Sequence, residues 1–217
     1  MKRKIFTYES DALVVEYEVA RCIHAAECVH GLPGVFDPKR RPWIDASAAS
    51  ADDIAKVIQA CPTGALRYQR RDGVPGEPTA ERNTARVASD GPVYLEGEIR
   101  LHLPNGEVLE ENRVALCRCG ASKNKPFCDN SHVEAGFTDP ATRLESQLRP
   151  AQETPSNGTL NLRLAPNGPV LIDGPVTLSC EGQATSEGVK GALCRCGHSR
   201  NKPYCDGAHA KEGFEAE

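Results

Sequence analysis

Short apolar segments separated by turn residues recur along the chain and predict strands more often than helices. Segments 4–8 and 13–19 are rich in Val, Tyr and Phe, and the polar Glu-Ser-Asp between them predicts a β-hairpin. Farther along, segments 93–96 and 99–103 alternate or run apolar as strands, followed by a Pro-Asn-Gly turn at 104–106. Segments 170–172 and 176–178 repeat this pattern.

One stretch has the period of a helix. It opens at Ser50 or Ala51, with two Asp residues favourably placed in its first turn. Pro62 ends it, and a short strand follows at 65–68. Its apolar positions fall at i, i+3, i+4 and i+7, so they share one face, and they are Ile54, Val57, Ile58 and Cys61.

An internal repeat fixes the domain organisation that we expect. Segment 91–119 aligns without gaps on segment 168–196, so the repeat covers strands as well as the motif described next. The polar segments outside the repeat are predicted to be linkers. The predicted divisions are a first domain at 1–70, a linker at 71–90, a first repeat at 91–140, an inter-repeat linker at 141–167 and a second repeat at 168–217.

Each repeat contains a cluster of cysteines and a histidine. Residues 116–132 read LCRCGASKNKPFCDNSH and residues 193–209 read LCRCGHSRNKPYCDGAH, so both have the order C-x-C-x8-C-x3-H. Thiolate and imidazole hold iron–sulfur clusters or zinc. The Gly, Ser, Asn and Pro of the x8 segment predict a loop that folds back, and Asp129 and Asp206 are expected to accept a backbone N–H near the histidine. The candidate ligands are Cys117, Cys119, Cys128 and His132, then Cys194, Cys196, Cys205 and His209.

The long pattern CRCGxSxNKPxCDxxH resembles the CDGSH iron–sulfur family, the mitoNEET-like proteins. The resemblance implies that each set of three Cys and one His holds a [2Fe–2S] cluster. It also implies that the two β-rich repeats pair about a pseudo-twofold axis, so that a monomer contains an internal pseudo-dimer. Two positions depart from the family name, Asn130 in place of Gly and Ala208 in place of Ser, and neither is a ligand. The alternative from the residues alone is structural zinc, for which C-x-C with a long loop is atypical.

The first domain contains three further cysteines in another arrangement. Cys22-x5-Cys28, followed far on by Cys61-Pro62, resembles a single-cluster 4Fe–4S ferredoxin whose middle cysteine position holds Ala25. The resemblance implies a third cluster, [3Fe–4S] or [4Fe–4S], and the three remaining thiolates favour [3Fe–4S]. The alternatives are an empty docking domain with three buried thiols, or His24 as a substitute ligand. His24 is one position away from the missing cysteine, and a solvent-facing role is preferred for it.

Composition and charge narrow the class of protein. The 217 residues include 19 Gly and 16 Pro, which suits small modules held together by metal, and these resemblances predict an α+β protein. The net charge of −4 without a basic stripe argues against a nucleic-acid partner, and no apolar run reaches membrane-spanning length. We expect a cytoplasmic protein whose ten cysteines are mostly metal ligands. The tenth, Cys180, aligns with Leu103 and is expected to be buried in a strand.

No nucleophile–base pair suggests an enzyme, so the chemistry is assigned to the clusters. The first hypothesis is electron transfer to a redox partner protein. The second is a cluster donor, store or sensor, which hands clusters to an apo-acceptor or responds to redox state or pH. A histidine ligand, with an unperturbed pKa of about 6.5, predicts faster cluster loss in mild acid.

Overall fold

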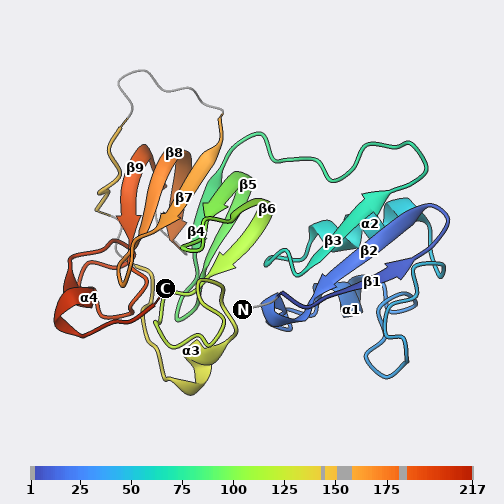
Figure 1. The fold of residues 1–217 in the computed structure, drawn as a ribbon, viewed down its shortest axis with the longest axis horizontal. Helices are drawn as coiled ribbons and strands as arrows, with labels where there is room; N and C mark the ends of the chain where they lie inside the picture. Colours follow the sequence, from blue (N-terminus) through green and yellow to red (C-terminus); the bar gives the residue numbers. More distant parts are fainter. Residues whose placement is uncertain (1–2, 143–144, 151–157, 181–184, 217) are drawn as a thin grey trace. The chain divides into compact units, whose positions relative to one another are not determined.

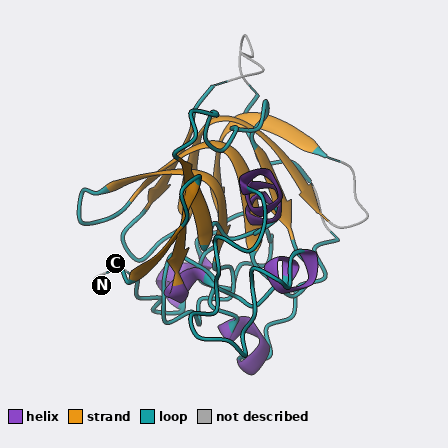
Figure 2. Ribbon diagram, turned by 90° about the vertical axis from the view of Figure 1, so that its right-hand side faces the viewer, coloured by secondary structure: helices purple, strands orange, loops and turns teal. Residues whose placement is uncertain are grey.

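The structure is a computed structural model, and it describes residues 3–142, 145–150, 158–180 and 185–216. It divides into two units, residues 1–78 and residues 79–217. The described chain is mostly β, with few and short helices (Figures 1 and 2), so strands contribute more than the α+β prediction implied. Each unit has its own hydrophobic core and is described separately.

The first unit packs a small antiparallel sheet against its longest helix. The strand order is β1 (Ile5–Glu9), β2 (Leu13–Glu18) and β3 (Leu66–Arg70), which confirms the predicted hairpin. The predicted helix is also confirmed, as α2 (Ala51–Gln59). It begins after Ser50, whose hydroxyl accepts the backbone N–H of Asp53 as an N-cap. The remaining helical segments are short: η1 (Val19–Arg21) and α1 (Glu27–Gly31).

The second unit is one sheet of six strands followed by short helical turns. Its helices are α3 and α4 (Figure 1). Each begins three residues after the third cysteine of its motif, which is Cys128 in the first repeat and Cys205 in the second. The bounds are β4 (Thr84–Val87), β5 (Val93–His102), β6 (Val108–Leu116), α3 (Ser131–Glu134), β7 (Leu160–Leu164), β8 (Val170–Cys180), β9 (Ser186–Leu193) and α4 (Ala208–Lys211).

The strand register of the second unit repeats with the sequence. Strand β4 runs antiparallel to β5 of its own repeat and parallel to β8 of the other repeat. Strand β7 runs antiparallel to β8 of its own repeat and parallel to β5 of the other. Strand β4 pairs Thr84 with Glu96 and with Thr177. The equivalent residues of the other repeat are Asn161, Asp173 and Arg100, and Asn161 pairs with both of the others. The two repeats therefore exchange their first strands symmetrically.

These exchanged strands differ from the sequence prediction. Strands β4 and β7 lie inside the segments 71–90 and 141–167 that were expected to be linkers. Both strands are short, and each takes one of its two neighbours from the other repeat, so the local sequence pattern of each is weak. The predicted pair of strands at 93–96 and 99–103 is one strand, β5, with a register shift between Glu96 and Ile99. Gly97 occupies this irregular position with φ +139°. A residue with a side chain does not fit there, because its Cβ atom would lie 2.1 Å from Asn83 Oδ1.

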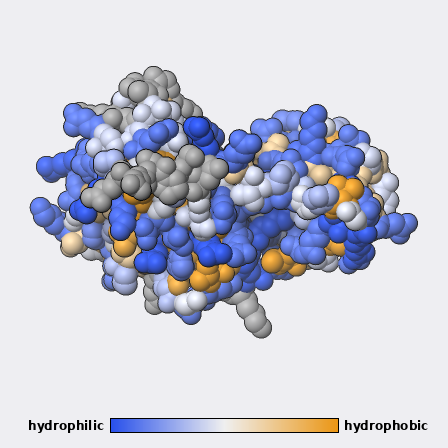
Figure 3. Space-filling model, turned by 90° about the horizontal axis from the view of Figure 1, so that it is seen from above, coloured by the Kyte–Doolittle hydropathy of each residue, from blue (hydrophilic) through white to orange (hydrophobic). Residues whose placement is uncertain are grey.

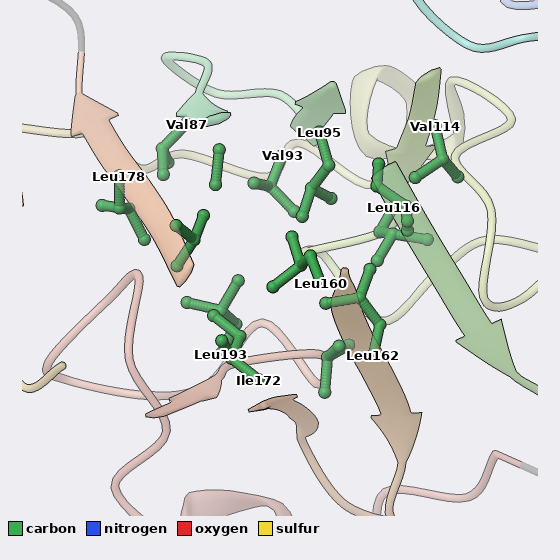
Figure 4. Close-up of a cluster of buried hydrophobic side chains, with 14 of the residues drawn as sticks. Val87, Val93, Leu95, Val114, Leu116, Leu160, Leu162, Ile172, Leu178 and Leu193 are labelled. Carbon is green, nitrogen blue, oxygen red and sulfur yellow. The ribbon is translucent and has the colours of Figure 1, made fainter. Parts of the chain in front are cut away.

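The core of the second unit collects apolar side chains from all six strands. Figure 4 shows these side chains pointing toward one another from both repeats. Cys180 is 3% exposed and belongs to this core, which confirms its predicted role. The labelled members are Val87, Val93, Leu95, Val114, Leu116, Leu160, Leu162, Ile172, Leu178 and Leu193. Because both repeats supply this core, neither repeat buries its apolar face alone.

The visible surface is largely hydrophilic. Figure 3 shows one face on which apolar side chains form only small patches. In the described part of the chain, every helix is too short and too polar to cross a bilayer.

Candidate iron–sulfur sites

The first candidate site forms where strand β6 ends. The loop after Cys117 folds back so that Phe127 pairs with Leu116. The backbone N–H of Cys117 donates to Pro126 O at 2.9 Å, and that of Cys128 donates to Ala115 O at 2.9 Å. This extension of the strand pairing places the third cysteine beside the first. The second copy has the same bonds, from Cys194 to Pro203 and from Cys205 to Ala192.

Polar contacts inside the loop hold its shape. The Ser122 hydroxyl donates to Phe127 O at 2.7 Å and accepts the backbone N–H of Asn124 at 3.0 Å. Asp129 accepts the backbone N–H groups of Lys123 and Ser131 at 2.8 and 3.0 Å. Ser199 and Asp206 make the same contacts in the second copy. The predicted role of the two aspartates is therefore confirmed.

The hydrogen bonds to Asp129 change the ionisation of its carboxyl group. Burial opposes the charge of Asp129, but hydrogen bonds from Ser131 and Lys123 hold its pKa below the usual range. The N-cap position itself is Asn130, whose φ of +69° is left-handed, and Gly207 has the matching φ of +86°. Asn is one of the few residues with a side chain that tolerates this conformation. The departure from Gly noted in the sequence therefore preserves the backbone shape.

The candidate ligands lie in pairs. Cys117 Sγ lies 3.6 Å from Cys119 Sγ, and Cys128 Sγ lies 3.6 Å from His132 Nδ1. In the second copy the corresponding separations are 3.7 Å for Cys194–Cys196 and 3.4 Å for Cys205–His209. Two ligands on one tetrahedral metal, each about 2.0 to 2.3 Å from it, lie about 3.5 to 3.8 Å apart. Each pair therefore has the spacing for one metal.

The candidate ligands of each copy lie as two pairs rather than as one group of four. In the part of the chain that the structure describes, no group of three or more His, Cys, Asp or Glu side chains is placed to hold one metal ion. Structural zinc sites need four such ligands around one ion. Two pairs, each suited to one metal, instead fit a centre with two irons.

Protonation of the first site follows its hydrogen bonds. The thiols of Cys117 and Cys119 share a hydrogen bond, which lowers the pKa of Cys119 to about 6 and, together with burial, raises the pKa of Cys117. Burial raises the pKa of Cys128 to about 11. Burial, and then the charge of Arg118, lowers the pKa of His132. This favours the neutral imidazole, which is the form that binds a metal.

Backbone N–H groups also point at the sulfurs. Ala121 donates to Cys119 Sγ at 3.4 Å, and His198 donates to Cys196 Sγ at 3.5 Å. Gly207 donates to Cys205 Sγ at 3.4 Å. Such bonds stabilise negative charge on ligating sulfur and raise the reduction potential of a cluster.

The arginine between the first two cysteines anchors the site to the sheet. Arg118 is 2% exposed, and its guanidinium donates to Gly91 O at 2.8 Å, to Ala88 O at 2.6 Å and to the carboxylate of Asp139. It also packs on the Phe137 ring. The guanidinium group of Arg118 therefore joins the cysteine segment to the turn that precedes strand β5.

The equivalent arginine of the second copy makes the same kind of carbonyl contacts but lacks the ion pair. Arg195 donates to Gly168 O and Ala165 O, both at 2.8 Å, and packs on the Phe214 ring. Among the described residues, no carboxylate pairs with Arg195, and its Nη1 atom is buried without a hydrogen-bond partner. Burial lowers its pKa.

The two ligand loops touch each other at the same end of the second unit. A Cβ atom on Gly120 would lie 2.4 Å from the carbonyl oxygen of Cys196, and one on Gly197 would lie 2.5 Å from that of Cys119. Lys202 of the second copy also lies over the Phe137 ring of the first, with Nζ 6.0 Å from its centroid. The cysteine segments of the two sites are therefore in backbone contact.

The three cysteines of the first unit line one cavity. Cys22 follows η1, Cys28 lies in α1 and Cys61 follows α2, and all three line a cavity of about 440 Å³. The pKa of Cys28 rises to about 11, mainly through burial and then through the charges of Cys61 and Cys22. The fold thus brings Cys61 to the cavity that Cys22 and Cys28, its distant neighbours in sequence, also line.

Sequence reasoning missed the residues that assemble this cavity. Arg21 is 1% exposed and donates to Thr63 O at 2.7 Å, which ties the segment before Cys22 to the segment after Cys61. The Thr63 hydroxyl lies 3.6 Å from Cys61 Sγ. Burial, and then a hydrogen bond with Cys22, raises the pKa of Tyr17. Thr63 follows the Cys61-Pro62 pair of the ferredoxin-like motif, but Arg21 and Tyr17 belong to no spacing motif, so the sequence carried no signal for these two residues.

Comparisons with known proteins agree with this geometry. Residues 8–71 match the family described as divergent 4Fe-4S mono-cluster, and residues 90–133 and 167–210 each match the iron-binding zinc finger CDGSH type. The uncharacterized protein YjdI of Escherichia coli, in strain K12 and in O157:H7, is 36% identical over 64 residues, which are 30% of this chain and 84% of YjdI. No solved structure matches the chain. The chain therefore belongs to the divergent 4Fe–4S mono-cluster family through its first unit, and it carries two iron-binding CDGSH domains in its second.

Proposed function

We propose that the protein is an electron carrier with two [2Fe–2S] clusters in its second unit and a third cluster in its first. The observation that carries the proposal is the pairing of ligands at 3.4 to 3.7 Å, one pair for each iron. The clusters supply one-electron transfer. The chain supplies the ligands, the N–H bonds to sulfur and the burial that sets the potential.

The contact between the two ligand loops supports transfer within one chain. Because Gly120 meets Cys196 and Gly197 meets Cys119, an electron on one cluster has a short path of protein backbone to the other. The symmetric exchange of β4 and β7 supports a monomer in which one chain supplies both halves. The acidic net charge of −4 favours a redox partner protein with a basic surface.

The third cluster is assigned to Cys22, Cys28 and Cys61. Their shared cavity supports this assignment, and three thiolates by themselves suit a [3Fe–4S] cluster. The hydroxyls of Tyr17 and Thr63 lie next to two of these thiols and would stabilise their negative charge.

Iron and acid-labile sulfide analysis of anaerobically purified protein tests the cluster types. Cys119→Ser is expected to remove about two irons and two sulfides per chain, because a two-iron centre loses one of its four ligands. Cys28→Ala is expected to remove the iron of the first unit alone. Cys180→Val is the control, since this buried thiol belongs to the core and is not a ligand. Equal iron loss in Cys180→Val, or zinc in place of iron, would contradict the proposal.

A cluster donor, store or sensor is the second candidate. His132 and His209 are only half-buried, so the iron that each would bind lies near solvent, where it is readily released. Rapid mixing with a reduced flavoprotein reductase separates the two functions. Electron transfer predicts fast bleaching of the visible absorption followed by full recovery on reoxidation. Cluster donation predicts instead that iron passes to an added apo-ferredoxin while the donor keeps its circular dichroism spectrum.

A further inference from the structure

The charges of the first unit balance, whereas those of the second do not. Residues 1–78 contain 11 Lys and Arg and 11 Asp and Glu, so the acidic excess of the chain lies in residues 79–217. The basic residues of the first unit include two short runs, at 2–4 and 39–41. A partner with a basic surface, which the net charge favours, therefore suits the second unit. The partner that suits the first unit depends on where its own charges lie.

Acidic side chains gather at one end of the small sheet, where a hairpin joins β1 to β2. Arg70 ends β3 beside this hairpin and pairs with Asp52 at 2.7 Å, so the first turn of α2 lies at the same end. Five carboxylates and two arginines lie here: Glu9, Asp11, Asp52, Asp53, Asp72, Arg70 and Arg71. This end of the first unit is therefore negative.

The cavity of the three cysteines lies at the opposite end of the sheet and is bordered by exposed apolar side chains. Tyr17, near the end of β2, lines the cavity, and Phe6 of β1 lies directly opposite it. Ile5, Phe6 and Val19 are 43%, 40% and 42% exposed. The Lys4 Nζ atom lies 4.9 Å from the centroid of the Phe6 ring. An apolar surface with a basic margin is the usual composition of a protein interface that receives an acidic partner.

Cations without a carboxylate partner stand at the opening of this cavity. Arg41 lines the cavity and is exposed, and its Nη1 atom donates to two carbonyl oxygens of its own loop, at 2.8 and 2.7 Å. Lys39 is exposed in the same loop, and among the described residues no carboxylate pairs with either side chain. Glu27 is the single carboxylate of the lining. His24 also lines the cavity and is exposed, as the sequence analysis expected.

We infer that an acidic electron-carrier protein docks on this basic end of the first unit, over the cavity of Cys22, Cys28 and Cys61. The inference rests on the proposed function, since it names the partner of an electron carrier. The first unit is negative at its hairpin end and basic at the cavity, so its field turns the cavity toward an approaching acidic protein. The exposed apolar side chains supply contact area, and docking there places the partner next to the first-unit cluster. Partners of opposite charge therefore reach different units of the chain.

Reduction by flavodoxin tests the inference on the full, cluster-loaded chain. Flavodoxin is an acidic one-electron carrier, and its anionic hydroquinone gives one electron to [3Fe–4S]⁺, which leaves the neutral semiquinone and [3Fe–4S]⁰. Rapid-freeze electron paramagnetic resonance follows the decay of the [3Fe–4S]⁺ signal, which Cys28→Ala lacks. Arg41→Glu and Lys39→Glu are each expected to slow this reaction about tenfold at low ionic strength. The difference from wild type is expected to vanish in about 0.5 M salt, where the charges are screened.

Lys56→Glu is the matched control, because it changes the net charge equally at an exposed lysine of α2 that does not line the cavity. It is expected to slow the reaction about twofold or less. Lys39→Glu guards against a local effect of Arg41→Glu, since it removes none of the carbonyl contacts of Arg41. Equal slowing in Lys56→Glu and Arg41→Glu would show that net charge alone acts, and would overturn the docking surface.

The outcomes also separate the inference from the function on which it rests. A first-unit cluster that dithionite reduces and flavodoxin does not would overturn the docking surface and leave electron transfer in place. A wild-type sample without the signal that Cys28→Ala lacks would overturn the third cluster itself. Unchanged iron in the second unit of each variant shows that the chain has folded.

Discussion

Gly120→Ala is expected to lower the free energy of unfolding of the second unit by about 3 kcal/mol and to deplete the cluster of the other repeat. The new Cβ atom would lie 2.4 Å from the carbonyl oxygen of Cys196, which is backbone and cannot rotate away. Moving it displaces Cys196, a candidate ligand of the second CDGSH domain. A substitution in the first repeat therefore damages the second cluster, which thermal melting and iron analysis together detect.

Gly106→Ala is the matched control for this variant. Gly106 has φ +85°, close to the +77° of Gly120, but a Cβ atom there meets no other atom within 4 Å. It is expected to cost only the left-handed penalty of about 1 kcal/mol and to leave the iron content unchanged. Equal losses of stability and iron in the two variants would show that backbone strain, rather than contact between the ligand loops, limits the substitution.

Arg118→Met is expected to destabilise the second unit by about 3 to 5 kcal/mol. The substitution leaves the carbonyls of Gly91 and Ala88 without their donor and deprives the Asp139 carboxylate of its charged partner. Asp139 is largely buried, with 14% of its side chain exposed, so its lone charge is costly. Urea unfolding followed by far-ultraviolet circular dichroism measures the loss.

Three further variants isolate the buried charge. Arg195→Met is expected to cost less, about 1 to 3 kcal/mol, because it breaks similar bonds to carbonyls but leaves no carboxylate behind. Adding Asp139→Asn to Arg118→Met is expected to recover part of the loss. Arg100→Met, at an exposed ion pair with Glu110, is expected to cost about 1 kcal/mol or less. If Arg118→Met and Arg100→Met are equally stable, Arg118 does not anchor the site.

The sequence predicted well those features that depend on contacts between near neighbours. The Ser50 cap and the apolar face with Ile54 and Ile58 place α2 correctly, since both depend on residues within a few positions of one another. The aspartate that follows each third cysteine was likewise predicted to accept a nearby backbone N–H. The chain length of each loop fixes which residues can reach one metal, so the candidate ligands were readable as a pattern.

The sequence did not predict features in which distant segments meet. Strands β4 and β7 lie in predicted linkers, because a short strand is stabilised mainly by edges that other segments provide. Nothing local indicates that Arg21 reaches Thr63, because the two residues are far apart in sequence.

By itself, the sequence determined the candidate chemistry of this protein: two sets of three Cys and one His, three further thiols and the repeat that carries the two sets. These follow from covalent spacing, which folding does not change. Only the tertiary structure decided that the candidate ligands form pairs and that the two ligand loops touch through Gly120 and Gly197. The residues of each pair are close in sequence, but the folded loop sets the backbone conformation that brings their side chains together. The contact between the loops joins segments far apart in sequence, which only long-range packing brings together.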